Sequence, residues 1–133
     1  MLKKLAALLL LGALASFAAE VSRLTPAAAA KLVADGQAVL IDVREPAEWF
    51  QTGVAQPAVL LPQSDFENAQ FEWKPFLEKA PKDKTLILYC RSGKRAGNIA
   101  AALAEKGYRV ANAGGLKDWI DAGLPTRQLE TKK

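Results

Sequence analysis

The residues best suited to chemistry lie in one short segment, Cys90-Arg91-Ser92-Gly93-Lys94-Arg95. Cys90 is the only cysteine of the chain, and three cationic side chains lie within the five residues that follow it. An apolar strand pattern ends at Cys90 and a helical pattern begins at Arg95, so the loop is expected at the amino end of a helix. The helix dipole, the backbone N–H groups and the cations of such a loop favour a thiolate over a thiol. The segment therefore predicts an activated sulfur nucleophile facing a pocket for small anions.

The composition removes most other ways of activating a nucleophile. The 133-residue chain contains no histidine, which excludes Ser-His-Asp catalysis, Cys-His catalysis and metal sites with histidine ligands. A single cysteine excludes an internal disulfide, a Cys-x-x-Cys motif and a zinc knuckle. We therefore expect no metal and no cofactor. Lys+Arg at 18 against Asp+Glu at 14, with no basic stripe, predicts no nucleic-acid partner.

The first 18 residues have the pattern of a secretory signal peptide. Lys3 and Lys4 precede an apolar run over 5–15, and Ser16-Phe17-Ala18 supplies small residues for cleavage. We expect cleavage after Ala18, with Ala19 as the second choice, which leaves 19–133 as one periplasmic or secreted domain. A retained anchor helix is the alternative. The run is shorter than the roughly 20 residues of a membrane span, so no membrane association is expected after cleavage.

The remaining chain alternates between helical and extended patterns. Strands are expected at 38–43, 85–89 and 108–110, and helices at 27–34, 46–50, 95–106 and 116–121. The segment 64–79 predicts one or two helices interrupted at Pro75, and 112–115 predicts a turn. Strands separated by helices indicate an α/β domain, with a central parallel sheet of about four to five strands and helices on both faces.

Four segments, in order, resemble motifs of the rhodanese-like sulfurtransferase family. They are 41–49, which contains Asp42, Arg44 and Glu48-Trp49, then the loop 89–96, the helix and strand at 103–110, and 114–125 with its Gly-Gly and Gly-Leu-Pro sequences. The exported single-domain form is similar to the periplasmic phage-shock-type rhodaneses. One departure from the family is Gly53-Val54-Ala55-Gln56-Pro57-Ala58, which lacks the histidine and later glycine that members commonly carry there.

The resemblance implies a rhodanese-like fold and a mechanism that needs no histidine. Cys90 would be the catalytic residue, taking the outer sulfur of thiosulfate or a similar anionic donor and holding it as a persulfide. A thiol or cyanide would accept the sulfur, and a protein acceptor is a further candidate. The residues expected to bind the substrate are Arg91, Ser92, Gly93, Lys94, Arg95 and Arg44. Asp42 and Ala96 are expected to support the active-site loop.

Two other functions remain open at this point. A cysteine loop at a helix amino end also serves phosphatases and arsenate reductases, but these have five residues between cysteine and arginine, whereas four separate Cys90 from Arg95. The second alternative is a sulfur carrier or binding module that a partner protein loads, with little turnover of small donors. The aromatic segment from Phe66 to Phe76 is expected to pack against the sheet, with a docking surface for a partner as the alternative.

Overall fold

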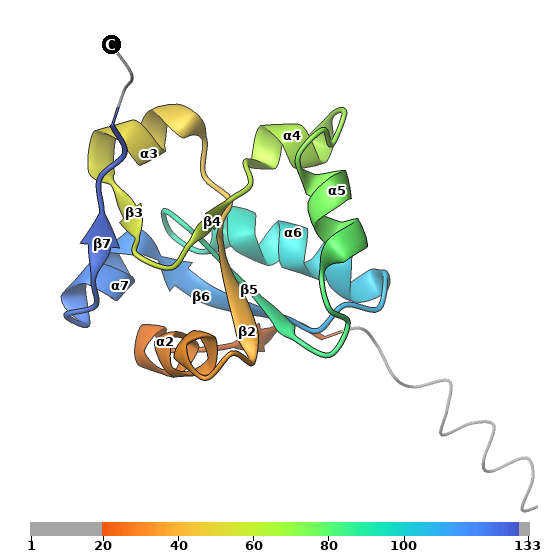
Figure 1. Cartoon of the computed structure of the whole chain (residues 1–133), viewed down its shortest axis with the longest axis horizontal. Helices are drawn as coiled ribbons and strands as arrows, with labels where there is room; N and C mark the ends of the chain where they lie inside the picture. Colours follow the sequence, from red (N-terminus) through yellow and green to blue (C-terminus); the bar gives the residue numbers. More distant parts are fainter. Residues whose placement is uncertain (1–19, 131–133) are drawn as a thin grey trace, which may run out of the picture.

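The computed structural model describes residues 20–130, and these are built around a five-stranded parallel sheet (Figure 1). Its strands are β1 (Ser22–Arg23), β2 (Ala38–Asp42), β4 (Val59–Leu60), β5 (Thr85–Cys90) and β6 (Val110–Gly115), in the spatial order β1-β6-β5-β2-β4. Every neighbouring pair in this sheet is parallel. The α/β fold with a parallel sheet of about four to five strands is therefore confirmed. The predicted signal peptide, 1–18, lies outside the described residues.

Helices connect the strands in the order that a parallel sheet requires. They are α2 (Pro26–Ala34), α3 (Pro46–Thr52), α4 (Gln63–Glu67), α5 (Trp73–Lys79), α6 (Lys94–Glu105) and α7 (Leu116–Asp121). The segment that departs from the family forms β3 (Val54–Ala55), which pairs antiparallel with β7 (Thr126–Arg127) in a separate small sheet. Among the helices of residues 20–130, none is long and apolar enough to cross a membrane.

The two central strands bury side chains on both faces of the sheet. Along β5, Leu86, Leu88 and Cys90 join the core beneath α4, α5 and α6, whereas Ile87 and Tyr89 join the core beneath α2 and α7. Figure 1 shows α2 on the opposite side of the sheet from α4 and α5. A strand that is buried on both faces reads as a continuous apolar run, which explains why β2 and β5 were predictable.

The aromatic segment forms two helices, but the predicted break at Pro75 is wrong. The chain leaves the helical path between α4 and α5, where the Asp65 carboxylate accepts backbone N–H groups from Phe71, Glu72 and Trp73 at 2.8, 2.9 and 2.9 Å. Pro75 lies in the first turn of α5. Proline is tolerated there because the first N–H groups of a helix have no intrahelical partner.

The strand predicted at 108–110 is present, but its bounds were wrong: it begins at Val110 and runs through the residues assigned to a turn. Asn112-Ala113-Gly114-Gly115 continues β6 and is buried, between β1 and β5. Asparagine and glycine have low strand propensity, and here the neighbouring strands on both sides override it. Gly115 has no side chain, which leaves room for the backbone of the cysteine loop.

We expect Trp73→Ala to lower the free energy of unfolding by about 3–5 kcal/mol, because it deletes a large core side chain. Trp73 has no exposed surface, contacts the rings of Phe66 and Phe76, and donates its indole N–H to the carbonyl of Pro62. Denaturant unfolding measures the change. Phe71→Ala is the matched control: Phe71 is 82% exposed, and its loss is expected to cost less than about 0.5 kcal/mol. Equal losses of unfolding free energy in the two variants would contradict the buried position of Trp73.

Candidate active site

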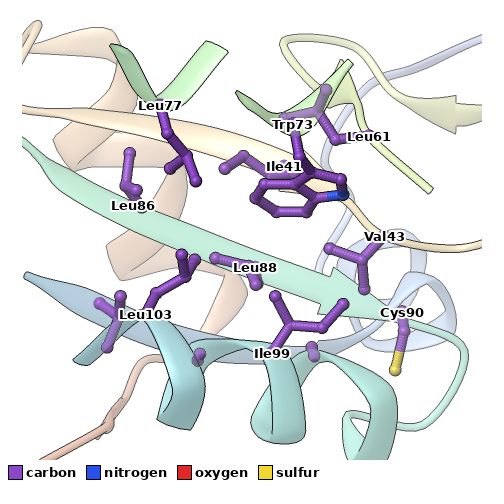
Figure 2. Packing of buried hydrophobic residues seen from close by; sticks show 13 residues of the cluster. Ile41, Val43, Leu61, Trp73, Leu77, Leu86, Leu88, Cys90, Ile99 and Leu103 are labelled. Carbon is purple, nitrogen blue, oxygen red and sulfur yellow. The ribbon is translucent and has the colours of Figure 1, made fainter. Parts of the chain in front are cut away.

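Cys90 is the last residue of β5 and has no exposed surface. Figure 2 shows it at one end of the buried cluster, beyond Leu88 and near Ile99 of α6. The three residues after it turn the chain, and α6 begins at Lys94. The N–H of Gly93 donates to Cys90 Sγ at 3.0 Å, and Gly93 adopts φ 100°, a left-handed conformation that favours glycine. The sulfur therefore lies in a backbone turn at the amino end of a 12-residue helix.

A cavity of about 630 Å³ opens beside the cysteine loop. Its walls come from the loop and α6 on one side and from α3 and α7 on the others. The lining residues are Arg44, Glu48, Gln51, Thr52, Arg91, Arg95, Leu116, Lys117 and Ile120. Four of these are cationic and one is anionic, so the cavity suits an anionic ligand.

The structure separates the predicted basic residues into two groups. Arg91 and Arg95 line the cavity, whereas Lys94 is exposed and is not part of its wall. Ser92 is also exposed outside the wall. Lys117 is a cavity cation that the sequence reasoning missed, because it comes from α7 and reaches the site only through the fold. No local signal marked it.

An ion pair joins the two long walls of the cavity. Arg95 of α6 donates Nη1 and Nη2 to Glu48 of α3 at 2.8 and 2.9 Å, with both side chains about a quarter to a third exposed. The hydrogen bond with Arg95 lowers the pKa of Glu48 below its ordinary value, and the same bond raises the pKa of Arg95. Arg95 keeps its Nε–H and one N–H on each Nη for a ligand.

Asp42 and Arg44 form a buried ion pair that braces α3. Arg44 is 3% exposed, and its Nε and Nη2 atoms donate to the Asp42 carboxylate at 2.8–3.1 Å. The remaining Nη2 proton goes to the carbonyl of Gly53, and Nη1 donates to Thr52 Oγ1. Burial opposes the charge of Arg44, but Asp42 outweighs it and raises the pKa of Arg44. One Nη1 proton is left for the cavity, so the substrate-binding role of Arg44 stays a prediction.

The other predicted support, Ala96, packs in the core beneath the first turn of α6 and has no exposed surface. A closer support, which the sequence reasoning missed, comes from the end of β6. A Cβ on Gly115 would lie 2.0 Å from the carbonyl oxygen of Arg91, so the cysteine loop rests on bare backbone. Asn112 joins the same two segments, donating to the carbonyl of Gly93 at 2.8 Å and accepting the N–H of Gly114 at 2.9 Å. The adjacent glycines were the one available signal of such a close approach.

Replacing Glu48 by glutamine tests the ion pair through the pH dependence of stability. A carboxyl group with a pKa lower in the folded than in the unfolded state stabilises the fold above its unfolded pKa, and this contribution disappears as the pH falls through the folded pKa. We expect the free energy of unfolding of the wild type to exceed that of Glu48→Gln by at most about 1 kcal/mol at neutral pH. The difference should shrink as the pH falls below the ordinary value of 4.5. Denaturant unfolding across this range measures it, with exposed Glu78→Gln as the control, and a constant difference would contradict the pairing.

Comparisons with known proteins agree with this fold. The model of the rhodanese-like domain matches residues 25–122. The chain is 38% identical over 89 residues to a sulfurtransferase of Allochromatium vinosum, covering 65% of this chain and 76% of the relative. It is 34% identical over 106 residues to the thiosulfate sulfurtransferase GlpE of Actinobacillus succinogenes, covering 78% of this chain and 88% of the relative.

Some other relatives are longer, and the match covers as little as 28% of their length. Among solved structures, a rhodanese with anions from E. coli superposes with a TM-score of 0.53 at 32% identity, covering 68% of this chain and 96% of that one. The matched domain, which spans most of the described residues, includes both walls of the cavity and the whole cysteine loop. The chain therefore belongs to the rhodanese-like sulfurtransferase family.

Proposed function

We propose that this protein moves a sulfane sulfur from thiosulfate, or a similar anionic donor, to a thiol or cyanide through a persulfide on Cys90. The observation that carries the proposal is the position of Cys90 Sγ: it accepts the N–H of Gly93 at 3.0 Å, at the amino end of α6 and beside a cationic cavity. A hydrogen-bond donor and a helix amino end both favour a negatively charged sulfur.

The reaction divides into two transfers at sulfur. The Cys90 thiolate attacks the outer sulfur of thiosulfate, a new S–S bond forms, and sulfite leaves with the electron pair of the old S–S bond. An acceptor thiolate or cyanide then attacks the outer sulfur of the persulfide, and the Cys90 thiolate leaves. Neither transfer takes a proton from Cys90 once the thiolate exists, so no histidine base is required.

The cations of the cavity have distinct parts in this proposal. Arg91 and Arg95 face the cavity and would bind the oxygens of the donor, where charge moves as sulfite leaves. Glu48 holds the guanidinium of Arg95 in place before a ligand binds. Lys94 was predicted to bind the same oxygens, but it lies outside the wall of the cavity. Its charge would instead add to the positive electrostatic potential around the site.

Transfer outside the cytoplasm is part of the same proposal. It rests on the signal pattern of residues 1–18 and the expected cleavage after Ala18. An unpaired thiol in an oxidising compartment is exposed to oxidation, and Cys90 is the only cysteine of the chain. The mass of the protein purified from its native compartment tests the cleavage site.

Intact-protein mass spectrometry before and after thiosulfate tests the persulfide. We expect wild type to gain the mass of one sulfur atom, to lose it on addition of cyanide, and Cys90→Ala to gain nothing. The added sulfur must be on Cys90, since the chain has no second cysteine. No mass change in protein whose Cys90 is reduced would refute the use of thiosulfate and favour a partner-loaded carrier or oxyanion chemistry.

Arg91→Ala and Lys94→Ala form a matched pair, because both remove one cation from the loop but only Arg91 lines the cavity. We expect Arg91→Ala to lower kcat/KM for thiosulfate roughly tenfold or more, since it removes a charge-assisted hydrogen bond to the donor. Lys94→Ala should lower it by less than about threefold, because the charge is exposed and screened. Steady-state kinetics with cyanide as acceptor measures both. Equal losses would show that the two cations act through the potential alone.

A further inference from the structure

Asn112 is a buried polar residue beside the active-site loop that the proposed reaction does not use. It lies on β6 and is 5% exposed. Its Nδ2 donates to the carbonyl of Gly93, and its Oδ1 accepts the N–H of Gly114. One side-chain amide therefore ties the cysteine loop to the strand beneath it.

The strand end needs this amide because β6 contains an irregularity there. Leu88 of β5 pairs with Asn112, but Cys90 pairs with Gly115, so β6 carries one more residue than β5 over this interval. Such a bulge leaves backbone groups without a ladder partner. Gly114 lies in the bulge with φ 82°, and its N–H is the group that Asn112 accepts. Asn112 thus completes the bend that carries Gly115 under the carbonyl of Arg91.

A second observation, on α6, points to the same side chain. Gly97 lies inside the helix, where glycine is disfavoured relative to alanine. A Cβ at this position would lie 3.2 Å from Nδ2 of Asn112, and this is the one contact that it would make within 4 Å. The absence of a side chain at Gly97 therefore gives the Asn112 amide room to approach the helix.

We infer that Asn112 is a positioning residue for sulfur transfer, acting on Cys90 through Gly93. Gly93 is held on both sides: its N–H donates to Cys90 Sγ, and its carbonyl accepts both the Asn112 amide at 2.8 Å and the N–H of Gly97 at 2.9 Å. Without the amide only the N–H of Gly97 holds this carbonyl, so the left-handed Gly93 is positioned less tightly and its N–H stabilises a charged sulfur less well. The role in transfer rests on the proposed function, whereas the effect on the sulfur itself does not.

Asn112→Ala in the whole protein tests the inference through the pH profile of Cys90 alkylation by iodoacetamide. The thiolate is the reactive form, so a less stabilised thiolate reacts at higher pH. We expect the alkylation profile of the variant to lie at higher pH than that of the wild type, because the hydrogen bond from Gly93 to the charged sulfur is weakened. Thermal unfolding confirms that the variant is folded, and an unchanged profile in the folded variant overturns the inference.

Gly97→Ala separates positioning from stability. Alanine favours the helix, but its Cβ crowds the Asn112 amide at 3.2 Å. A purely structural role for this corner therefore predicts that the Tm changes in either direction while the alkylation profile stays unchanged. We expect the added Cβ to displace the Asn112 amide and to move the alkylation profile in the same direction as Asn112→Ala. If Asn112→Ala does not fold, an unchanged profile in Gly97→Ala overturns the inference.

Asp118→Ala is the matched control in the same corner. The Asp118 carboxylate accepts the N–H of Gly115 at 3.0 Å, whereas the hydrogen bonds of Gly93 go to Cys90, Asn112 and Gly97. Its loss should leave the alkylation profile at the same pH as in the wild type or move it to lower pH. A shift equal to that of Asn112→Ala would mean that any loosening of the corner has the effect, and it overturns the specific role of Asn112.

The alkylation assay uses no sulfur donor, so it remains informative if thiosulfate proves not to be the substrate. In that case wild type forms no persulfide, and the proposed function fails on the mass measurement alone. If wild type forms the persulfide, Asn112→Ala is also expected to form it several-fold more slowly at neutral pH, while Asp118→Ala forms it at the wild-type rate. Equal rates of persulfide formation in all three proteins would show that Asn112 has no role in the sulfur transfer.

Discussion

The contact between the backbone of the cysteine loop and the backbone at the end of β6 constrains the whole site. Cys90 pairs with Gly115 just after the bulge in β6, and a Cβ on Gly115 would lie 2.0 Å from the carbonyl oxygen of Arg91. The loop can therefore turn tightly enough to aim the N–H of Gly93 at the sulfur only if the neighbouring strand ends in glycine. Because β5 and β6 are parallel neighbours, the same sheet edge carries the cysteine and the surface on which its loop rests.

The opposite wall of the cavity depends on a different kind of interaction. Asp42 ends β2, the other neighbour of β5, and its ion pair with Arg44 reaches Thr52 and Gly53 at the end of α3. A helix fixed in this way holds Glu48 where it meets Arg95 of α6. The guanidinium is then oriented before any ligand arrives, and dipoles that need no rearrangement stabilise shifting charge best. The buried pair therefore positions the Glu48–Arg95 contact through α3.

The sequence predicted those parts of the molecule that local pattern determines. Apolar runs indicated β2 and β5, and a cysteine between a strand and a helix indicated the loop, because both signals lie within a few residues. The end of β6 was missed because burial between two neighbours, rather than the propensity of Asn112 or Gly114, makes it a strand. The pairing of Glu48 with Arg95 spans 47 residues, and Lys117 comes from α7, so spacing along the chain could not reveal either one.

Residues with poor intrinsic propensity for their element collect around the sulfur. Gly97 lies inside a helix, Gly114 and Asn112 lie in a strand, and Gly93 takes a left-handed conformation. Each lowers local stability by the loss of a favourable side chain or conformation, and the surrounding apolar core of both sheet faces offsets that loss. Elsewhere in the domain, sequence preference and structure largely agree. The disagreement is concentrated where the cysteine loop, the end of β6 and the first turns of α6 approach one another closely, and this close approach holds the N–H of Gly93 on the sulfur.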